Sequence, residues 1–297
     1  MKKERFLAGC ICFFTLSLML IPIAAGTEGT RIRSVSASDA IQGKNLNEED
    51  FHILLIGQDE RPGEPGKRSD SLILCSFQPG KQKMILTSFL RDLYVKIPGY
   101  GYERLNAAYA MGGPELLDRT LEENFGVRVD GNIEVDFDQF SGIIDQLGGV
   151  QLELRADEAR EISRLAETIG EGMQRLNGRQ ALVYARIRKL DADSDFSRTL
   201  RQRKLLTALA EQYRSLNFPE MVKLCRKILP AITTDLNGFE ILTYGKQILP
   251  MLKNMEIESS RVPQDGTAHD ETIRGMQVLK PDLPAVREKL KNMLEAG

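Results

Sequence analysis

The stretch Phe51-His-Ile-Leu-Leu-Ile-Gly57 decides the fold class. It is a short apolar run ended by glycine, and such a run is typical of a β-strand that is buried on both faces. Because strands of this kind lie inside a sheet rather than at its edge, we expect residues 51–57 to form a central strand.

Strand and helix signals alternate in the residues that follow. Apolar or alternating runs predict further strands at residues 71–77, 84–89, 131–137 and 150–154. Pro114 favours a helix start and Gly126 a helix end, and Asp138 is a typical cap for a helix that runs to residue 147. This alternation predicts an α/β fold with a central mixed β-sheet flanked by helices.

The rest of the chain continues without a break in composition. It predicts helices at residues 219–229, 238–252 and 283–294 and strands at residues 255–262 and 275–279. We therefore assign residues 51–297 to a single domain, with the core motifs in residues 51–206 and an α/β remainder in residues 207–297.

The N-terminal region has the composition of a membrane anchor. Residues 6–25 contain no charged side chain, and a basic flank precedes them. About 20 apolar residues cross a bilayer as a helix, and a basic flank stays in the cytoplasm. We expect a cytoplasmic tip and transmembrane signal-anchor in residues 1–26, a flexible stalk in residues 27–50, and a single-pass cell-membrane protein with an extracellular C-terminal domain. A cleaved signal peptide is the alternative, because Ala24-Ala25 offers small residues near a cleavage point.

The composition argues against several classes of function. The 297 residues are 42% hydrophobic and 28% charged with a net charge of −2, so no overall charge attracts nucleic acid. The two histidines, His52 and His269, are too few and too separated for a histidine metal site. Two of the four cysteines lie in the apolar N-terminal segment, and Cys75 and Cys225 are typical small buried residues, although a bridge between them stays open.

Residues 186–203 form a basic cluster in a chain of nearly neutral charge. Its members are Arg186, Arg188, Arg198, Arg201 and Arg203. Asp195 is a typical N-cap for a helix over residues 196–215, which places Arg198 and Gln202 one turn apart on one face. Upstream, Asn177 is a typical cap for a short helix to residue 184, and we expect Arg186 and Arg188 to alternate in the extended chain that follows.

Cations in the first turns of a helix oppose the helix macrodipole. An anion bound by guanidinium groups and by the first backbone N–H groups of the helix would remove this conflict. A solvated basic face without a ligand is the alternative, and Arg201 and Arg203 are the members that this alternative fits best.

Charged residues also flank the predicted strands. Asp59 follows the first strand and Asp70 precedes the second, so pairing of these strands brings the two carboxylates together. One or two carboxylates together with substrate phosphates usually hold Mg²⁺, and ordinary loop chemistry is the alternative. Arg91 and Asp92 follow the strand at residues 84–89, where open α/β sheets bind ligands, and a structural Arg91–Asp92 pair is equally consistent.

These residues belong to a series of motifs in a fixed order. The motifs are Asp59-Glu-Arg61, Arg68-Ser-Asp-Ser71, Ser88-Phe-Leu-Arg-Asp92, Arg104-Leu-Asn-Ala-Ala-Tyr109, Gly112-Gly-Pro-Glu115, Asp145-Gln-Leu-Gly-Gly-Val150, Leu176-Asn-Gly-Arg-Gln-Ala-Leu182, Asp195-Phe-Ser-Arg198 and Arg201-Gln-Arg203. Taken together, they resemble the LytR–CpsA–Psr family of membrane-anchored cell-envelope enzymes. Two positions depart from the family pattern, since Arg104 stands where Lys is frequent and Leu90 where Pro is common.

The resemblance implies a phosphotransferase that moves a glycopolymer, such as wall teichoic acid or capsular polysaccharide, from an undecaprenyl-pyrophosphate carrier onto peptidoglycan as a phosphodiester. It also implies a role for each matching residue. Asp59 and Asp70 would hold Mg²⁺ against the pyrophosphate, and Asp92 would orient or deprotonate the sugar hydroxyl. The pyrophosphate oxygens would be bound by Arg91, Arg104, Asn106, Arg186, Arg188, Arg198 and Gln202, of which Arg91, Arg186 and Arg188 would also act in catalysis.

Phosphoryl transfer is consistent with such a set, because it depends on positioning and on charge stabilisation more than on covalent chemistry by the protein. The implied partners are the lipid-linked glycan donor, the peptidoglycan acceptor and the cell membrane. A non-catalytic protein that binds polyprenyl phosphates or anionic glycan is the alternative. A transcription regulator is disfavoured, because the charge is near neutral and no helix-turn-helix pattern is present.

Overall fold

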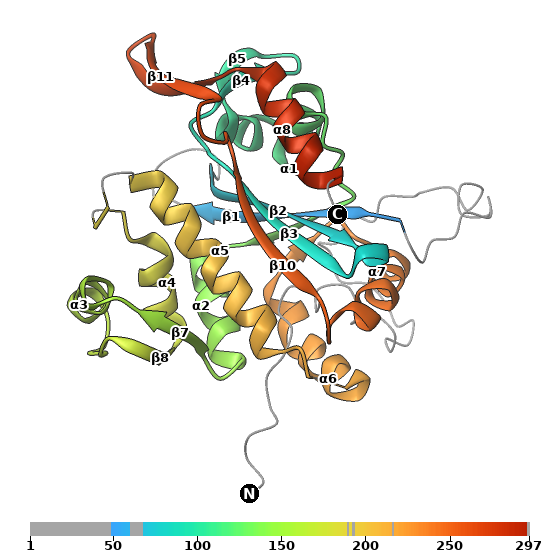
Figure 1. The fold of residues 1–297 in the computed structure, drawn as a ribbon, viewed down its shortest axis with the longest axis vertical. Helices are drawn as coiled ribbons and strands as arrows, with labels where there is room; N and C mark the ends of the chain where they lie inside the picture. Colours follow the sequence, from blue (N-terminus) through green and yellow to red (C-terminus); the bar gives the residue numbers. More distant parts are fainter. Residues whose placement is uncertain (1–48, 60–67, 189, 192–193, 216, 296–297) are drawn as a thin grey trace, which may run out of the picture.

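The computed structural model describes residues 49–59, 68–188, 190–191, 194–215 and 217–295. Its centre is a six-stranded sheet in the order β10-β3-β2-β1-β6-β9 (Figure 1). The strands are β1 (Phe51–Asp59), β2 (Arg68–Gln78), β3 (Lys83–Phe89), β6 (Gly131–Val135), β9 (Thr233–Thr234) and β10 (Glu256–Val262). Parallel pairs join β1 to β6 and β3 to β10, and antiparallel pairs join β2 to both neighbours and β9 to β6. The predicted mixed α/β sheet is therefore confirmed, with β1 inside it.

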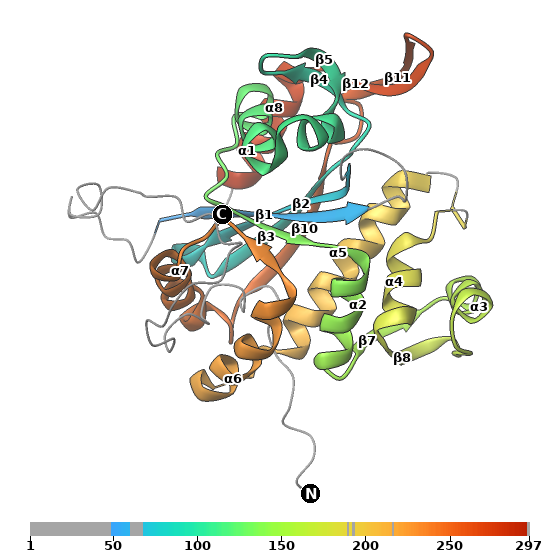
Figure 2. The same cartoon turned by 180° about the vertical axis from the view of Figure 1, so that it is seen from behind.

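Helices cover both faces of the sheet, as Figures 1 and 2 show. One face packs against α2 (Phe137–Gln146), α4 (Gly178–Arg186), α5 (Ser194–Gln212) and α7 (Gly238–Met251), with α6 (Phe218–Ile228) beside α2. The other face packs against α1 (Leu105–Phe125) and α8 (Leu283–Glu295). The sheet thus separates two layers of helices, each with its own hydrophobic core.

Three two-stranded sheets, one more α-helix and two short 3-10 helices, Pro79–Lys81 and Leu229–Ala231, complete the described fold. The sheets and the α-helix are β4 (Tyr94–Ile97) with β5 (Gly101–Arg104), β7 (Val150–Leu154) with β8 (Gly172–Leu176), β11 (Ala268–Ile273) with β12 (Met276–Pro281), and α3 (Ala156–Leu165). A parallel bridge between Leu93 and Leu279 ties the β4–β5 hairpin to β12. The β4–β5 and β11–β12 hairpins lie at the end of the molecule that carries α1 and α8 (Figure 2).

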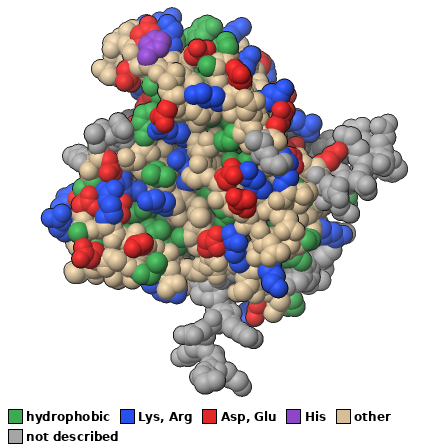
Figure 3. Space-filling model, viewed as in Figure 1, with side chains coloured by type: hydrophobic (Ala, Val, Ile, Leu, Met, Phe, Trp, Pro, Cys, Tyr) green, Lys and Arg blue, Asp and Glu red, His purple; other side chains and the backbone are tan. Residues whose placement is uncertain are grey.

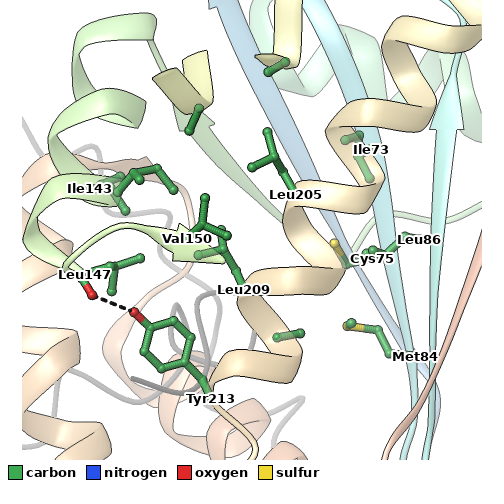
Figure 4. Packing of buried hydrophobic residues seen from close by; sticks show 14 of the residues in the cluster. Ile73, Cys75, Met84, Leu86, Ile143, Leu147, Val150, Leu205, Leu209 and Tyr213 are labelled. Atoms are coloured by element: carbon green, nitrogen blue, oxygen red, sulfur yellow. Dashed lines mark hydrogen bonds between the residues drawn. The ribbon is translucent and has the colours of Figure 1, made fainter. Parts of the chain in front are cut away.

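The alternation of side chains along β1 explains the two cores. Phe51 and Ile53 belong to the core under α2, α4 and α5, whereas Leu54 and Ile56 belong to the core under α1. All four are at most 3% exposed, as expected of a strand buried on both faces. Figure 4 shows the first core, in which the Tyr213 hydroxyl donates to the Leu147 carbonyl at 3.2 Å.

Cys75 lies in this first core as a free, buried thiol, so the alternative of a bridge to Cys225 is wrong. Burial raises the pKa of the Cys75 thiol, which keeps it protonated and unreactive.

Several predicted helix boundaries are wrong. The cap of α2 is Asp136, which accepts from the Gln139 N–H at 2.8 Å, and Asp138 lies inside the first turn. The helix predicted from Pro114 to Gly126 is the second part of α1, because Gly112 and Gly113, whose φ and ψ are not helical, divide α1 just before Pro114; the first part, from Leu105, was not predicted. The strands β4, β5, β8, β9 and β11 are not predicted from the sequence, because they are short or lack a clear apolar alternation.

The predicted anchor and stalk, residues 1–26 and 27–50, lie almost entirely outside the residues that the structure describes. In the part of the chain that is described, none of the helices combines the length and the apolar composition that a bilayer crossing requires.

Candidate functional site

The charged residues singled out from the sequence meet at one edge of the central sheet. Because β1, β3, β6 and β10 run in one direction and β2 runs in the other, the C-terminal ends of those four strands and the N-terminal end of β2 share this edge. The end of α4 and the start of α5 reach the same edge, beside the end of β1 in Figures 1 and 2. Residues far apart in the sequence are therefore brought together by strand direction.

Three arginines and two aspartates form a continuous ion-pair network at this edge. Arg91 Nη1 donates to Asp70 Oδ1 at 2.7 Å, and Arg188 Nη2 lies 3.8 Å from Asp70 Oδ2. Asp195 lies within 3.8 Å of Arg91, 3.7 Å of Arg188 and 3.4 Å of Arg198. These three arginines and two aspartates have a net charge of +1, and the nearby Arg186 adds a further positive charge.

The environment of Arg198 is unusual for a cation. Its side chain is only 3% exposed, and its Nε has no hydrogen-bond partner among the described residues. Burial is the main influence that lowers the pKa of Arg198 to about 10, and the charges of Arg188 and Arg91 act in the same direction. A buried, under-partnered cation beside other cations favours a bound anion.

Asp70 stays ionised in the same surroundings. Burial alone would raise the pKa of Asp70, but the hydrogen bond from Arg91 and the charges of Arg91, Arg198 and Arg188 outweigh burial and lower it. The carboxylate therefore carries a full negative charge at neutral pH and holds the network together.

The network opens into a polar hollow of about 270 Å³. Ser71 Oγ donates to Gln202 Oε1 at 2.9 Å on its wall, and the Arg186 guanidinium stacks 4.3 Å above the centre of the Phe137 ring. The volume is close to the lower end of the range of roughly 300–1,000 Å³ for small-molecule sites, so the hollow suits a head group rather than a whole lipid. It is lined by Gly57, Asp70, Ser71, Phe137, Arg186, Arg188, Arg198 and Gln202.

An apolar cavity of about 150 Å³ adjoins the polar hollow between the sheet and the helices α2, α4 and α5. Apart from Asp136, the residues that line this cavity alone are aliphatic or aromatic, including Ile133, Ile143, Phe140 and Leu205. The two spaces share Gly57, Ser71, Phe137, Arg186 and Gln202. A molecule with an anionic head and a hydrocarbon tail would therefore meet a matching surface at each end.

Asp92, Arg104 and Asn106 lie beside the hollow and do not line it. Asp92 is 3.4 Å from Arg91 and 3.4 Å from Arg104, and the Asn106 N–H donates to the Arg91 carbonyl at 3.2 Å. The structure thus connects these three predicted residues to the network through Arg91. The side chain of Asp59 lies outside the described part of the structure, although its backbone ends β1 at the same edge.

The basic helix α5 differs from the expectation in two ways. It begins at Ser194, so Asp195 lies in its first turn and faces the arginines instead of capping the helix. Arg201 and Arg203 do not face outward, because both are buried on other sides of α5. Arg201 Nε donates to Glu158 at 2.8 Å, and Arg203 Nε donates to Ser259 Oγ at 2.6 Å.

Arg186 also differs from the expectation, since it is the last residue of α4 and not part of an extended chain. Only Arg188 lies beyond the helix end at Ile187. Both still line the hollow, because the end of α4 lies at the same edge of the sheet.

Sequence reasoning missed Asp195, Ser71 and Phe137 as members of the site. The position of Asp195 could have been found from charge balance, because three neighbouring arginines require a counter-charge. Ser71 and Phe137 carry no comparable signal, since their roles depend on the register of β2 and on the end of β6.

Comparison with known proteins matches residues 23–294 to the model of the LytR_cpsA_psr family. The chain belongs to the LytR_cpsA_psr family. Within it, the chain is 37% identical over 257 residues to the polyisoprenyl-teichoic acid–peptidoglycan teichoic acid transferase TagU of Oceanobacillus iheyensis, with 80% of this chain and 75% of TagU covered. It is 36% identical over 199 residues to the regulatory protein MsrR of Staphylococcus aureus, with 66% of this chain and 57% of MsrR covered. The match thus spans little more than half the length of MsrR.

Solved structures of the LytR_cpsA_psr family show the same fold. TagT bound to LIIa-WTA has a TM-score of 0.68 and 28% identity, with 86% of this chain and 94% of that chain covered. TagT with bound octaprenyl pyrophosphate lipid has a TM-score of 0.65 and 26% identity over the same shares. TagT, a relative of this chain, therefore binds octaprenyl pyrophosphate lipid and LIIa-WTA.

Proposed function

We propose that this LytR_cpsA_psr family protein is a phosphotransferase that moves a glycopolymer from a polyprenyl-pyrophosphate carrier onto peptidoglycan. The observation that carries the proposal is the arginine-lined hollow that opens into an apolar cavity. The transferase activity in the name of TagU and the lipid in the TagT structure support it. The names of these relatives favour wall teichoic acid as the glycopolymer.

The proposed binding mode follows from the two adjoining spaces. The pyrophosphate would occupy the polar hollow, where Arg188, Arg198 and Arg186 offer guanidinium groups to its oxygens. Arg91 would support them through Asp70, which it holds by a hydrogen bond of 2.7 Å. The prenyl chain would enter the apolar cavity, since hydrocarbon is removed from water there.

The proposed reaction needs one displacement at phosphorus. A hydroxyl oxygen of the acceptor sugar forms a new bond to the phosphorus that carries the glycan, and the pyrophosphate P–O bond on the lipid side breaks. Polyprenyl monophosphate leaves with the bonding electron pair, and the hydroxyl proton passes to a nearby base, for which Asp92 is our candidate. The arginines would stabilise the charge that develops on the phosphoryl oxygens.

Asp70 meets the requirements for one protein ligand of Mg²⁺. It is ionised, and its Oδ2 lies 3.8 Å from Arg188, beyond hydrogen-bond distance. Mg²⁺ is usually held by one or two carboxylates together with substrate phosphates, and Asp59 is the second carboxylate that we propose. When bound, the ion would withdraw negative charge from the pyrophosphate. No group of three or more His, Cys, Asp or Glu side chains suited to a metal ion occurs among the described residues.

The proposal includes the location of the protein. We propose that residues 1–26 retain the chain in the cell membrane and that the domain lies outside the cell, where peptidoglycan is found. The apolar segment and its basic flank in the sequence support this arrangement.

Reconstitution of the full chain in detergent tests the function. We expect the protein, supplied with lipid-linked glycan, peptidoglycan and Mg²⁺, to release polyprenyl monophosphate and to attach glycan to peptidoglycan. Arg188→Ala should lower the rate by about 10²–10³-fold, as for removal of one donor from an electrostatic site. Arg164→Ala is the matched control, because Arg164 is an exposed arginine on α3 far from the hollow.

The same experiment separates an enzyme from a non-catalytic binder. Tight binding of the lipid-linked glycan without release of polyprenyl monophosphate, in a correctly folded protein, would favour the binder and contradict the proposed transfer.

A further inference from the structure

The β4–β5 hairpin carries an exposed aromatic surface that the proposed reaction does not use. Tyr100 is 61% exposed and Tyr102 is 56% exposed, whereas tyrosine side chains are normally partly buried in the protein. Figure 3 shows some hydrophobic side chains exposed at this end of the molecule, among basic and acidic side chains. The hairpin therefore offers aromatic rings and charge to solvent together.

The register of the hairpin places four side chains on one face. Tyr94 pairs with Arg104 and Lys96 pairs with Tyr102, so these four residues share the outer face. The rings of Tyr94 and Tyr102 stack with centroids 5.8 Å apart. The opposite face carries Val95 and Ile97, which are fully buried in the core under α1.

The turn of the hairpin holds the third tyrosine in place. The Tyr100 N–H donates to the Ile97 carbonyl at 3.0 Å, and Gly99 has a φ of +83°, which suits glycine at the third position of a type II turn after Pro98. The outer face is thus a two-stranded surface that ends at the turn residue Tyr100.

This surface is continuous with the charged site. Arg104 lies 3.4 Å from Asp92, which lies 3.4 Å from Arg91 of the ion-pair network. Strand rise of about 3.3 Å per residue places the tyrosine end roughly 10–15 Å from Asp92. The outer face of the hairpin therefore begins at the site and leads away from it.

The reaction geometry indicates which substrate would lie there. In an in-line displacement the attacking and leaving oxygens are on opposite sides of the phosphorus. In the proposed binding mode, the leaving lipid phosphate would point toward the apolar cavity on the α2, α4 and α5 side of the sheet. The attacking hydroxyl must then approach from the other side, where Asp92, Arg104 and the hairpin lie.

We propose that the outer face of the β4–β5 hairpin binds the acceptor, a peptidoglycan glycan strand, and presents its hydroxyl to the phosphate hollow. The proposal rests on the proposed function. The tyrosine rings would pack against the apolar faces of pyranose rings, and Lys96 would pair with carboxylates of the strand. The donor glycan is the less suitable occupant, because it remains bonded to the phosphorus and does not need to approach in line.

Binding of the acceptor alone gives a direct test. Soluble, uncrosslinked peptidoglycan glycan chains are titrated into the full chain in detergent, without donor. We expect Tyr100→Ala/Tyr102→Ala to weaken binding by at least about tenfold, which corresponds to the loss of two aromatic contacts. Tyr100→Phe/Tyr102→Phe should bind like the wild type, because the rings remain. Phe239→Ala is the matched control, since Phe239 is an exposed aromatic residue on α7, away from the hairpin.

Transfer kinetics give the second readout. The double alanine variant should raise the KM for peptidoglycan while leaving the KM for the lipid-linked donor unchanged. The proposal is overturned if the double alanine variant binds glycan chains as well as the wild type does. It is also overturned if only the KM for the donor rises, or if the variant keeps its binding of glycan chains and instead loses binding to lipid vesicles. If the wild type binds glycan chains, the double alanine variant does not, and the wild type transfers nothing, the proposed function fails while the hairpin is still supported as a glycan-binding surface.

Discussion

Arg198 combines a cost to stability with a benefit to ligand binding. It is buried at 3% exposure, its pKa is lowered by burial to about 10, and its nearest carboxylate, Asp195, is shared with Arg91 and Arg188. Such a cation adds little stability to the folded protein without ligand, because the cost of desolvating the cation offsets the energy of the ion pair. A bound pyrophosphate would supply the missing partner.

We therefore expect Arg198→Met to separate stability from activity. The free energy of unfolding should change by less than about 1 kcal/mol or increase, because a buried cation is replaced by an apolar side chain of similar length. The transfer rate should fall by about 10²–10³-fold. Urea unfolding and the reconstituted assay measure the two quantities, with Lys204→Met, an exposed change on the same helix, as the control. A loss of several kcal/mol without ligand would show that Arg198 is structural.

The lowered pKa of Asp70 predicts that the stability of the protein depends on pH. Its pKa in the folded state lies below the unfolded value, so its ionised form stabilises the fold above the unfolded pKa, and this contribution is lost as the pH falls through the folded pKa. The destabilisation caused by Asp70→Asn should thus be greatest near neutral pH and should shrink below about pH 4. Thermal unfolding of both proteins between pH 7 and about pH 3 checks this. Glu153→Gln on β7 serves as the control, and a destabilisation that is constant over this range would contradict the assignment.

At the scale of elements, α5 presents three different sides to three neighbours. Arg198 and Gln202 face the hollow, Arg201 faces α3, and Arg203 faces β10. Arg201 and Glu158 are both 4% exposed and form an ion pair at 2.8 Å, with Asp191 as a second partner of Arg201. For Arg203, no carboxylate within ion-pair distance occurs among the described residues, and burial together with the charge of Arg261 lowers its pKa to about 10.

The two buried arginines should therefore differ in their response to the same substitution. Arg201→Met should destabilise the protein by about 3 kcal/mol, because Glu158 is left buried with less compensation. Arg203→Met should change stability by less than about 1 kcal/mol, because no buried carboxylate loses its partner. Urea unfolding of the two variants gives the comparison directly. Equal losses would mean that the packing of the arginine stems, and not their charge pairing, decides the outcome.

The sequence predicts elements well where the pattern is local. Residues 51–57 carry the apolar run of a buried strand, and Asn177 carries the cap of α4, which accepts from the Gln180 N–H at 2.9 Å. The sides of α5 could not be predicted in this way. Helical spacing groups Arg198 with Gln202, but the partners of Arg201 and Arg203 come from α3 and β10, 43 and 56 residues away. Only tertiary packing decides which arginine meets a carboxylate.

The same limit applies to the site. Arg91, Arg186, Arg188 and Arg198 could be singled out because arginine is easily recognised and their motifs resemble a family. Asp195 was assigned to a helix cap, since an acidic residue before a helical run normally has that role. The apolar cavity could not be foreseen, because the leucines and isoleucines that line it have the same local pattern as those of a filled core.

At the scale of the whole molecule, the sheet separates the proposed binding sites for the two substrates. The apolar cavity lies on the side of α2, α4 and α5, the charged residues lie at the sheet edge, and the β4–β5 hairpin lies on the side of α1. In the proposed reaction, the lipid-linked donor and the glycan acceptor would thus approach the same phosphorus from opposite sides of the sheet. The order of strands, rather than any single motif, creates this separation.

The volume of the apolar cavity leads to the last prediction. At about 150 Å³ it is smaller than sites for ordinary small molecules, which have roughly 300–1,000 Å³, so a polyprenyl chain requires α2, α4 and α5 to move away from the sheet. We expect Leu182→Trp, which places a large ring at the cavity wall, to abolish binding of polyprenyl pyrophosphate and to leave binding of inorganic pyrophosphate in the polar hollow unchanged. Titration of the full chain in detergent with each compound measures both. Leu165→Trp, an exposed change on α3, is the control for the added ring. If Leu182→Trp weakens both ligands equally, the two spaces do not bind the two halves of the lipid separately, and the proposed position of the prenyl chain is wrong.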